Sequence, residues 1–282
     1  RDSMPAIAWA AAVVAARDPD AVIGSFAADH VISRVDGFHA AVREAVALAR
    51  AGLLVTLGIT PTYAATGFGY IREGMPLGVE GAPSGCAVVE FVEKPDAARA
   101  ETYLASGEFR WNAGMFVVKA SVLLDLVEQW HPTMAADVRA LAAEPGRLDE
   151  LWPDLTKIAI DHAVAEPAAA AGRVAVVPAT FGWDDVGDFD SLAGLLEAHS
   201  ASAAGPAAAA GLSLIGDPAD LVSVDSTGLV VARAGRLVAL IGVDDLVVVD
   251  TPDALLVVPR SRAQEVKGIV DRLAGIDRDH LR

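Results

Sequence analysis

Cysteine, basic residues and long apolar runs are all scarce in this sequence, and each shortage excludes a class of protein. Cys86 is the single cysteine, so the chain can form no internal disulfide and a cytoplasmic location fits best. The chain has 22 Lys and Arg against 38 Asp and Glu, a net charge of −16, which argues against nucleic-acid binding through a basic surface. Anionic substrates would therefore need local cations or a metal ion to offset this field.

No apolar segment is long enough to cross a membrane. The longest apolar run, residues 6–16, is rich in Ala and falls short of the roughly 20 residues that a bilayer requires. We interpret this run as a buried helix and expect no membrane partner. The chain begins with Arg1 rather than Met, and we expect an N-terminal part to precede it.

Several familiar catalytic and metal-binding motifs are also absent. The sequence has no C-x-x-C or H-x-x-x-H pattern, which argues against a zinc site. It has no G-x-S-x-G nucleophile elbow and no G-x-x-x-x-G-K-[ST] phosphate loop.

What the sequence does contain is a large share of apolar residues in an alternating order. Of the 282 residues, 53% are hydrophobic and 21% are charged, which favours a folded protein with a large core. Predicted helices and strands alternate over residues 5–199, which indicates an α/β fold with a mostly parallel sheet. Residues 200–211 are almost all Ala, Gly, Ser and Pro and are interpreted as a linker. Short β-rich runs and a final helix follow, so we predict a small β unit over residues 212–282.

The most informative stretch is residues 88–95, a predicted strand that Pro95 ends. Glu93 and Lys94 lie at its carboxyl end, which is where open α/β sheets bind ligands. A carboxylate suits sugar hydroxyls, and an ammonium group suits a phosphate. The alternative is an ordinary surface ion pair at the end of a strand.

Two aspartates, Asp29 and Asp185, each follow a predicted strand of the same sheet. Two carboxylates at one sheet edge can hold Mg²⁺, which takes its other ligands from water and phosphates. Such an ion neutralises charge in phosphoryl or nucleotidyl transfer. The alternative is that each aspartate caps the helix that follows it. Asp184 and Asp188 compete for these roles.

Three further residues are candidates for structural or ligand-binding roles. His30 is interpreted as a packed loop residue. Gly69 lies in a predicted loop over residues 60–71, where glycine lets the backbone approach a ligand closely; a hairpin is the alternative. Asn112 precedes an apolar strand, and a buried Asn there must be hydrogen-bonded, either as a loop anchor or as a ligand contact.

Taken together, several segments resemble the sugar-nucleotide pyrophosphorylases, most closely the bacterial mannose-1-phosphate guanylyltransferases. The segments, in chain order, are Ala28-Asp29-His30, Thr66-Gly67-Phe68-Gly69-Tyr70-Ile71, Phe91-Val92-Glu93-Lys94-Pro95, Trp111-Asn112-Ala113-Gly114-Met115-Phe116, Trp183-Asp184-Asp185-Val186-Gly187 and residues 245–257. The order and spacing of these segments make the resemblance specific and extend it over nearly the whole chain.

The resemblance implies a fold and a reaction. The fold is a Rossmann-like nucleotidyltransferase domain over residues 1–199, followed by a small β-helix-like unit. The reaction is Mg²⁺-dependent, in-line transfer of GMP from GTP to mannose 1-phosphate, which gives GDP-mannose and pyrophosphate. Positioning and charge neutralisation supply the catalysis because no covalent enzyme intermediate is needed.

The resemblance also implies roles for single residues. Asp29 and Asp185 would bind Mg²⁺ and, with Lys94, make up the catalytic set. Lys94 would hold the sugar phosphate, while Glu93 and Asn112 would hold sugar hydroxyls.

The Gly69 backbone would lie against the hexose. A homo-oligomer is compatible with the sequence.

One departure from the family pattern leaves other functions open. The family opens with a glycine-rich loop, G-G-x-G-T-R-L-x-P, which cradles the triphosphate, and no such stretch occurs here. We expect the chain to begin one or two βα units late. The alternatives are a truncated or degenerate relative that binds a sugar phosphate or nucleotide sugar without catalysis, and a pyrophosphorylase for another hexose 1-phosphate and nucleoside triphosphate.

Overall fold

The computed structural model describes residues 1–200 and 211–273 and separates into two compact units. The first unit covers Arg1–Trp183 and the second covers Asp184–Arg282. Residues 201–210 of the predicted linker lie outside the described residues.

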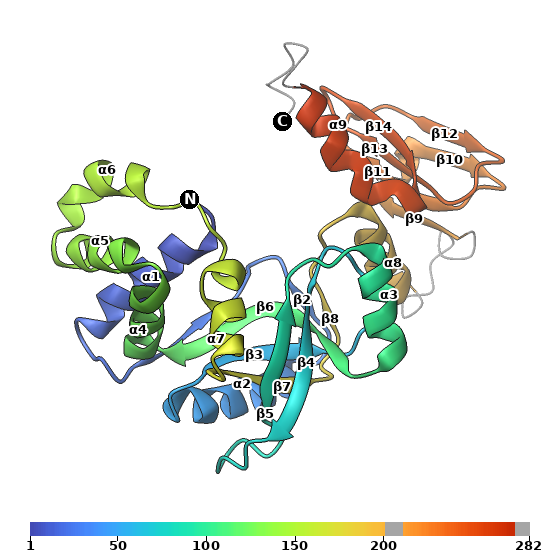
Figure 1. Ribbon diagram of the computed structural model, residues 1–282. Coiled ribbons are helices and arrows are strands. Elements are labelled where there is room, and N and C mark those ends of the chain that lie inside the picture. Colours follow the sequence, from blue (N-terminus) through green and yellow to red (C-terminus); the bar gives the residue numbers. More distant parts are fainter. Residues whose placement is uncertain (201–210, 274–282) are drawn as a thin grey trace. The chain divides into compact units, whose positions relative to one another are not determined.

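The first unit is built on a six-stranded sheet with the strand order β1-β6-β3-β7-β5-β4 (Figure 1). The strands are β1 (Val22–Ser25), β3 (Leu54–Ile59), β4 (Gly69–Pro76), β5 (Cys86–Val92), β6 (Phe109–Lys119) and β7 (Val174–Ala179), with a short β2 (Val31–Ile32) outside this sheet. The helices are α1 (Ser3–Ala15), α2 (Val35–Arg50), α3 (Ala97–Ser106), α4 (Ala120–Trp130), α5 (Pro132–Ala143), α6 (Leu148–Leu151) and α7 (Glu166–Ala170), the last preceded by a π-helix (Asp161–Ala165).

The predicted α/β class is confirmed, and the strand directions within the sheet are mixed rather than mostly parallel. Strands β3 and β7 pair in parallel, while β6 pairs antiparallel with β1, β3 and β4. Strand β6 lies between β1 and β3 and runs opposite to both, so these two strands share a direction without touching. The order of helices and strands along the chain does not show that an antiparallel strand, β6, lies between β1 and β3.

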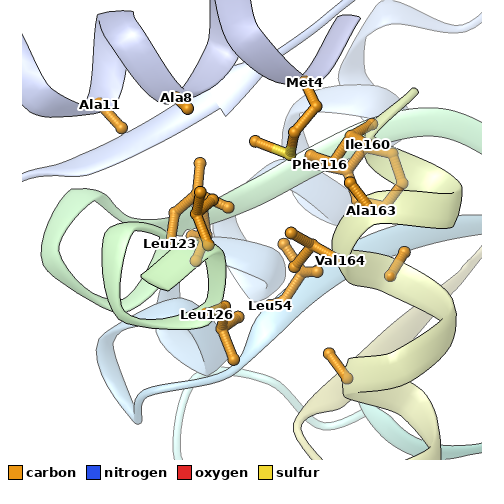
Figure 2. Packing of buried hydrophobic residues seen from close by; sticks show 14 of the residues in the cluster. Met4, Ala8, Ala11, Leu54, Phe116, Leu123, Leu126, Ile160, Ala163 and Val164 are labelled. Atoms are coloured by element: carbon orange, nitrogen blue, oxygen red, sulfur yellow. The ribbon is translucent and has the colours of Figure 1, made fainter. Parts of the chain in front are cut away.

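Successive side chains of each strand pack on opposite faces of the sheet, as strand geometry requires. Leu54 of β3 lies in one buried cluster, and Val55 and Leu57 lie in the other. Figure 2 shows the first cluster, in which Met4 of α1, Phe116 of β6 and Leu123 of α4 converge. The second cluster includes buried residues of α2. Each face of the sheet is therefore covered by helices.

The first cluster also anchors the segment that enters α7. Ile160, Ala163 and Val164 point into it (Figure 2) and are at most 3% exposed. The neighbouring polar residues Asp161 and His162 are excluded from this cluster. The segment is therefore held on one side by apolar packing, and its polar side chains are left for the site.

The second unit contains α8, a set of short strands and a final helix. Its elements are α8 (Phe189–Ser200), β9 (Leu212–Ile215), β10 (Leu221–Val224), β11 (Gly228–Ala232), β12 (Val238–Ile241), β13 (Leu246–Asp250), β14 (Leu255–Pro259) and α9 (Val266–Leu273); β8 (Trp183–Asp184) lies at the boundary in the sequence. Strand β11 pairs in parallel with β9 and β13, and β10 pairs in parallel with β12. The predicted C-terminal β unit with a final helix is confirmed.

None of the helices in residues 1–200 and 211–273 combines the length and the apolar character that crossing a membrane requires.

Candidate functional site

The four residues predicted to bind the sugar lie together in the first unit. Gly69, the first residue of β4, is the register partner of Asn112 on β6. Strand β5 pairs with β4 and leads directly into Glu93 and Lys94. The folded sheet thus brings together three segments that are well separated in the sequence.

Glu93 and Lys94 form an ion pair in which only the lysine is exposed. The Lys94 Nζ lies 3.4 Å from Glu93 Oε1, and the side chains are 63% and 10% exposed respectively. A surface pair would expose both side chains. The buried glutamate therefore distinguishes this strand end from an ordinary surface ion pair.

Gly69 is required by the position of the Glu93 carboxylate. A Cβ atom at residue 69 would lie 2.5 Å from Glu93 Oε2 and 3.2 Å from Asn112 Cβ. Real side chains do not approach so closely, so any other residue would displace the carboxylate. The glycine lets Glu93 lie directly against the backbone of β4.

Asn112 anchors a bulge in β6 through both the oxygen and the nitrogen of its side-chain amide. Its Oδ1 accepts hydrogen bonds from Thr56 Oγ1 at 2.7 Å and from the Gly114 amide at 3.1 Å. Its Nδ2 donates to Asp161 Oδ1 at 2.8 Å. Gly114 has φ of 66°, a conformation that favours glycine. An amide nitrogen carries two N–H groups, and among the described residues only one N–H of Asn112 donates a hydrogen bond, to Asp161.

Three residues of this site, Asp161, His162 and Glu166, are missing from the sequence prediction. Asp161 accepts the Asn112 bond. Glu166 Oε1 accepts the Glu93 amide at 3.1 Å, and Glu166 Oε2 lies 3.0 Å from His162 Nδ1. In the sequence, these residues are indicated only by the polar pair His162 and Glu166, four positions apart in an apolar helical segment. That spacing is equally typical of a solvent-exposed helix face.

The site is dominated by carboxylates whose proton affinities are shifted. Burial raises the pKa of Glu93, the charge of Asp161 raises it further, and Lys94 offsets part of the effect. Burial likewise raises the pKa of Asp161, which the Asn112 bond partly counteracts. The hydrogen bond to Glu166 raises the pKa of His162.

One oxygen of this cluster lacks a hydrogen-bond partner. Glu93 Oε2 is buried and accepts no hydrogen bond within the described part of the chain. Buried polar atoms in native proteins are almost always hydrogen-bonded. An oxygen of this kind beside the second N–H of Asn112 suits a ligand hydroxyl, which both donates and accepts.

Asp29 lies in the exposed loop that follows β1, and it does not cap a helix. Helix α2 begins at Val35 with Arg34 at its N-cap position. The adjacent His30 packs edge-on against Trp183, with ring centroids 5.3 Å apart, in agreement with its interpretation as a packed loop residue. A cavity of about 540 Å³ lined by His30 and mostly apolar side chains lies beside this loop.

Asp185 lies in the acidic turn of the second unit, where Asp188 caps the helix. The Asp188 carboxylate accepts the Ser191 amide at 2.9 Å, the bond expected of the N-cap of α8. Asp184 and Asp185 accept the amides of Val186 and Gly187 at 2.8 and 3.3 Å. The capping alternative is therefore wrong for Asp185, as it is for Asp29.

The metal-binding role of Asp29 and Asp185 stays a prediction. Asp29 belongs to the first unit and Asp185 to the second. In residues 1–200 and 211–273 no three His, Cys, Asp or Glu side chains gather into a group that could hold a metal ion. A pair of carboxylates remains compatible with Mg²⁺, because this ion keeps waters and phosphate oxygens among its ligands.

Comparison with known proteins places this geometry in a family. The model of the family described as nucleotidyl transferase matches residues 1–202. The chain belongs to the nucleotidyl transferase family. Residues 219–273 match a second model, described as the mannose-phosphate isomerase/GMP-like β-helix domain. The predicted resemblance and both parts of the predicted fold are confirmed.

Curated relatives match over almost the whole chain. The chain is 39% identical to mannose-1-phosphate guanylyltransferase of Escherichia coli, with 97% of this chain and 56% of that protein covered. It is 38% identical to the xanthan biosynthesis protein XanB of Xanthomonas campestris pv. campestris, with 99% and 56% covered. The chain thus spans about half the length of the curated relatives it matches.

A solved structure has the same fold. The crystal structure described as mannose-1-phosphate geranyltransferase from Thermus thermophilus matches with a TM-score of 0.80 and 31% identity. The match covers 97% of this chain and 76% of that one. It therefore includes both the sheet that carries the site and the C-terminal β unit.

Proposed function

We propose that this chain catalyses transfer of GMP from GTP to mannose 1-phosphate, with GDP-mannose and pyrophosphate as products. The observation that carries the proposal is the buried Glu93 carboxylate, held against Gly69 and beside Asn112, with the Lys94 ammonium at its rim. A sugar phosphate matches this arrangement, because it presents hydroxyls to the buried groups and a phosphate to the exposed cation. The names of the curated relatives support the choice of sugar and base.

In the proposed reaction, the residues of the site bind and orient the sugar phosphate. Lys94 holds the phosphate whose oxygen attacks the α-phosphorus of GTP. Glu93 accepts a hydrogen bond from a sugar hydroxyl, and the second N–H of Asn112 donates one. Fixing the attacking oxygen in this way lowers the entropic cost of the reaction.

Mg²⁺ is the proposed cofactor, with Asp29 and Asp185 as its candidate ligands on the resemblance alone. When bound, the ion would neutralise phosphate charge during nucleotidyl transfer. Both residues carry carboxylate oxygens, the ligand type that Mg²⁺ prefers. The carboxylates of the Glu93 site accept bonds from Asn112 and Lys94 instead.

The test is turnover of mannose 1-phosphate and GTP by the 282-residue chain with Mg²⁺, followed as pyrophosphate release. We expect release that depends on both substrates and stops when the metal is chelated. Asp185→Asn should abolish metal-dependent turnover with the fold intact by circular dichroism. Release with glucose 1-phosphate and UTP or dTTP, but not with the proposed pair, would favour another pyrophosphorylase. If no pair of sugar phosphate and nucleoside triphosphate gave pyrophosphate release, but the chain bound GDP-mannose, a non-catalytic relative would be favoured.

A further inference from the structure

Glu166 of α7 contacts both Glu93 and His162, one through each of its carboxylate oxygens. Its Oε1 accepts the backbone amide of Glu93 at 3.1 Å. Its Oε2 lies 3.0 Å from His162 Nδ1. One side chain of α7 thus binds the main chain immediately after β5, at the residue that carries the buried carboxylate.

The main chain turns sharply at Glu93 and Lys94, directly after β5, and we call these two residues the corner. Its backbone conformation is unfavourable. Lys94 has φ of 47°, in the left-handed region that residues other than glycine rarely adopt. Such conformations persist where the surrounding structure imposes them, and they concentrate at functional sites. The corner turns the side chains of two adjacent residues to different environments, with Glu93 buried and Lys94 exposed.

The π-helix before α7 explains how Glu166 and Asp161 reach the same site. The Glu166 amide donates to the Asp161 carbonyl, a bond that spans five residues instead of four. This wider turn brings side chains five positions apart to one side of the helix. The intervening Ala163 and Val164 are buried in the core on the other side (Figure 2). Glu166 is therefore presented to the corner by a segment that is itself well anchored.

We propose that Glu166, held by His162, is a positioning residue for the sugar phosphate. Its carboxylate fixes the main chain at Glu93 and Lys94, so that the buried carboxylate and the exposed ammonium stay beside each other, one for a sugar hydroxyl and the other for the phosphate. This inference rests on the proposed function, which places mannose 1-phosphate at this corner. Glu166 acts through Glu93 and Lys94 and has no role in the chemical step.

The test compares Glu166→Ala, Glu166→Gln and His162→Ala with the unaltered chain. Glu128→Ala is the matched control, because Glu128 also pairs with a basic side chain on a helix, Arg139 at 2.7 Å. We expect Glu166→Ala to raise KM for mannose 1-phosphate at least about tenfold and to leave KM for GTP unchanged. Glu166→Gln keeps an oxygen that can accept the Glu93 amide and should recover most of the loss. His162→Ala should give a smaller rise.

A second measurement needs no substrate. Hydrogen exchange at the Glu93 amide should speed up in Glu166→Ala and stay slow in Glu166→Gln, because only the alanine variant loses the acceptor. Exchange and KM like those of the control would overturn the proposal. Equal loss of kcat, both KM values and thermal stability would also overturn it, since that pattern is the mark of a purely structural residue.

The two proposals fail in different ways. Absence of turnover by the unaltered chain contradicts the proposed function. The positioning role is then tested by calorimetric titration with mannose 1-phosphate and by the rate of hydrogen exchange at the Glu93 amide. Weaker binding and faster exchange in Glu166→Ala would support it, whereas unchanged values would refute it.

Discussion

Glu93 in the first unit and Asp250 in the second are buried carboxylates with opposite surroundings. Asp250 is 1% exposed, and both its oxygens accept hydrogen bonds from the Arg236 guanidinium. Glu93 is 10% exposed and pairs with the Lys94 ammonium group through Oε1, while its Oε2 accepts no hydrogen bond in the described residues. The pKa of Asp250 is accordingly lowered by Arg236, whereas burial raises that of Glu93.

This difference in hydrogen bonding distinguishes a structural carboxylate from one that is kept for a ligand. A carboxylate that stabilises a fold is satisfied within the chain, because an unpaired buried charge is costly. A carboxylate kept for a ligand retains an unused acceptor and contributes to binding at the expense of stability. The following variants test this contrast, beginning with the largest expected effect.

Lys94→Ala removes the exposed cation of the Glu93 site. We expect kcat/KM for mannose 1-phosphate to fall at least about tenfold, because the phosphate loses its charged partner. Steady-state kinetics with varied sugar phosphate at saturating GTP measure the effect. Unchanged kinetics would contradict the phosphate role.

Gly69→Ala places a methyl group where the Glu93 carboxylate now lies. The Cβ would stand 2.5 Å from Oε2, so the carboxylate must move, and we expect KM for mannose 1-phosphate to rise. Gly146→Ala is the matched control, because a Cβ at residue 146 meets no atom within 4 Å. If both substitutions changed KM equally, Gly69 would have no specific role in binding mannose 1-phosphate.

Asp250→Ala leaves Arg236 without its buried partner and should act on stability alone. We expect a lower Tm than that of the unaltered chain, with kcat and KM for both substrates unchanged. Differential scanning fluorimetry and steady-state kinetics on the same preparation measure both quantities. A loss of sugar-phosphate affinity with unchanged Tm would contradict a purely structural role for Asp250.

Glu93→Gln should produce the opposite combination. Because burial raises the pKa of Glu93 above its unfolded value, the ionised carboxylate destabilises the fold at neutral pH. Glutamine cannot ionise, so we expect a small rise in Tm near neutral pH together with a higher KM for mannose 1-phosphate. A lower Tm would mean that the carboxylate stabilises the fold.

The smallest effect concerns acid stability. The folded-state pKa of Asp250 is depressed, so its stabilisation is present above the unfolded value of about 3.9 and is lost as pH falls through the folded value. Asp250→Asn should therefore flatten this part of the stability curve below about pH 4. Urea unfolding across a pH series from acid to neutral measures the change, and a curve parallel to that of the unaltered chain would contradict it.

Local patterns in the sequence were sufficient for many of the helices and strands and for four residues of the site, Gly69, Glu93, Lys94 and Asn112. The bounds of α3 follow from local signals, because Asp96 caps its first turn and Gly107 ends it. Glu93 and Lys94 were found because a proline ends their strand. The loop predicted over residues 60–71 already enters β4 at Gly69, since pairing with a distant strand decides where a strand begins.

Tertiary structure decided which of these residues meet and in what state. Asp161, His162 and Glu166 follow a helical pattern that also fits a solvent-exposed face, and only the π-helix and the packing of Ala163 and Val164 turn them toward β5 and β6. The burial of Glu93 depends on Gly69, which is 24 positions away in the sequence but directly opposite in the fold. Composition and short-range spacing act through neighbouring residues, whereas burial and proton affinity arise from atoms that only the folded chain brings together.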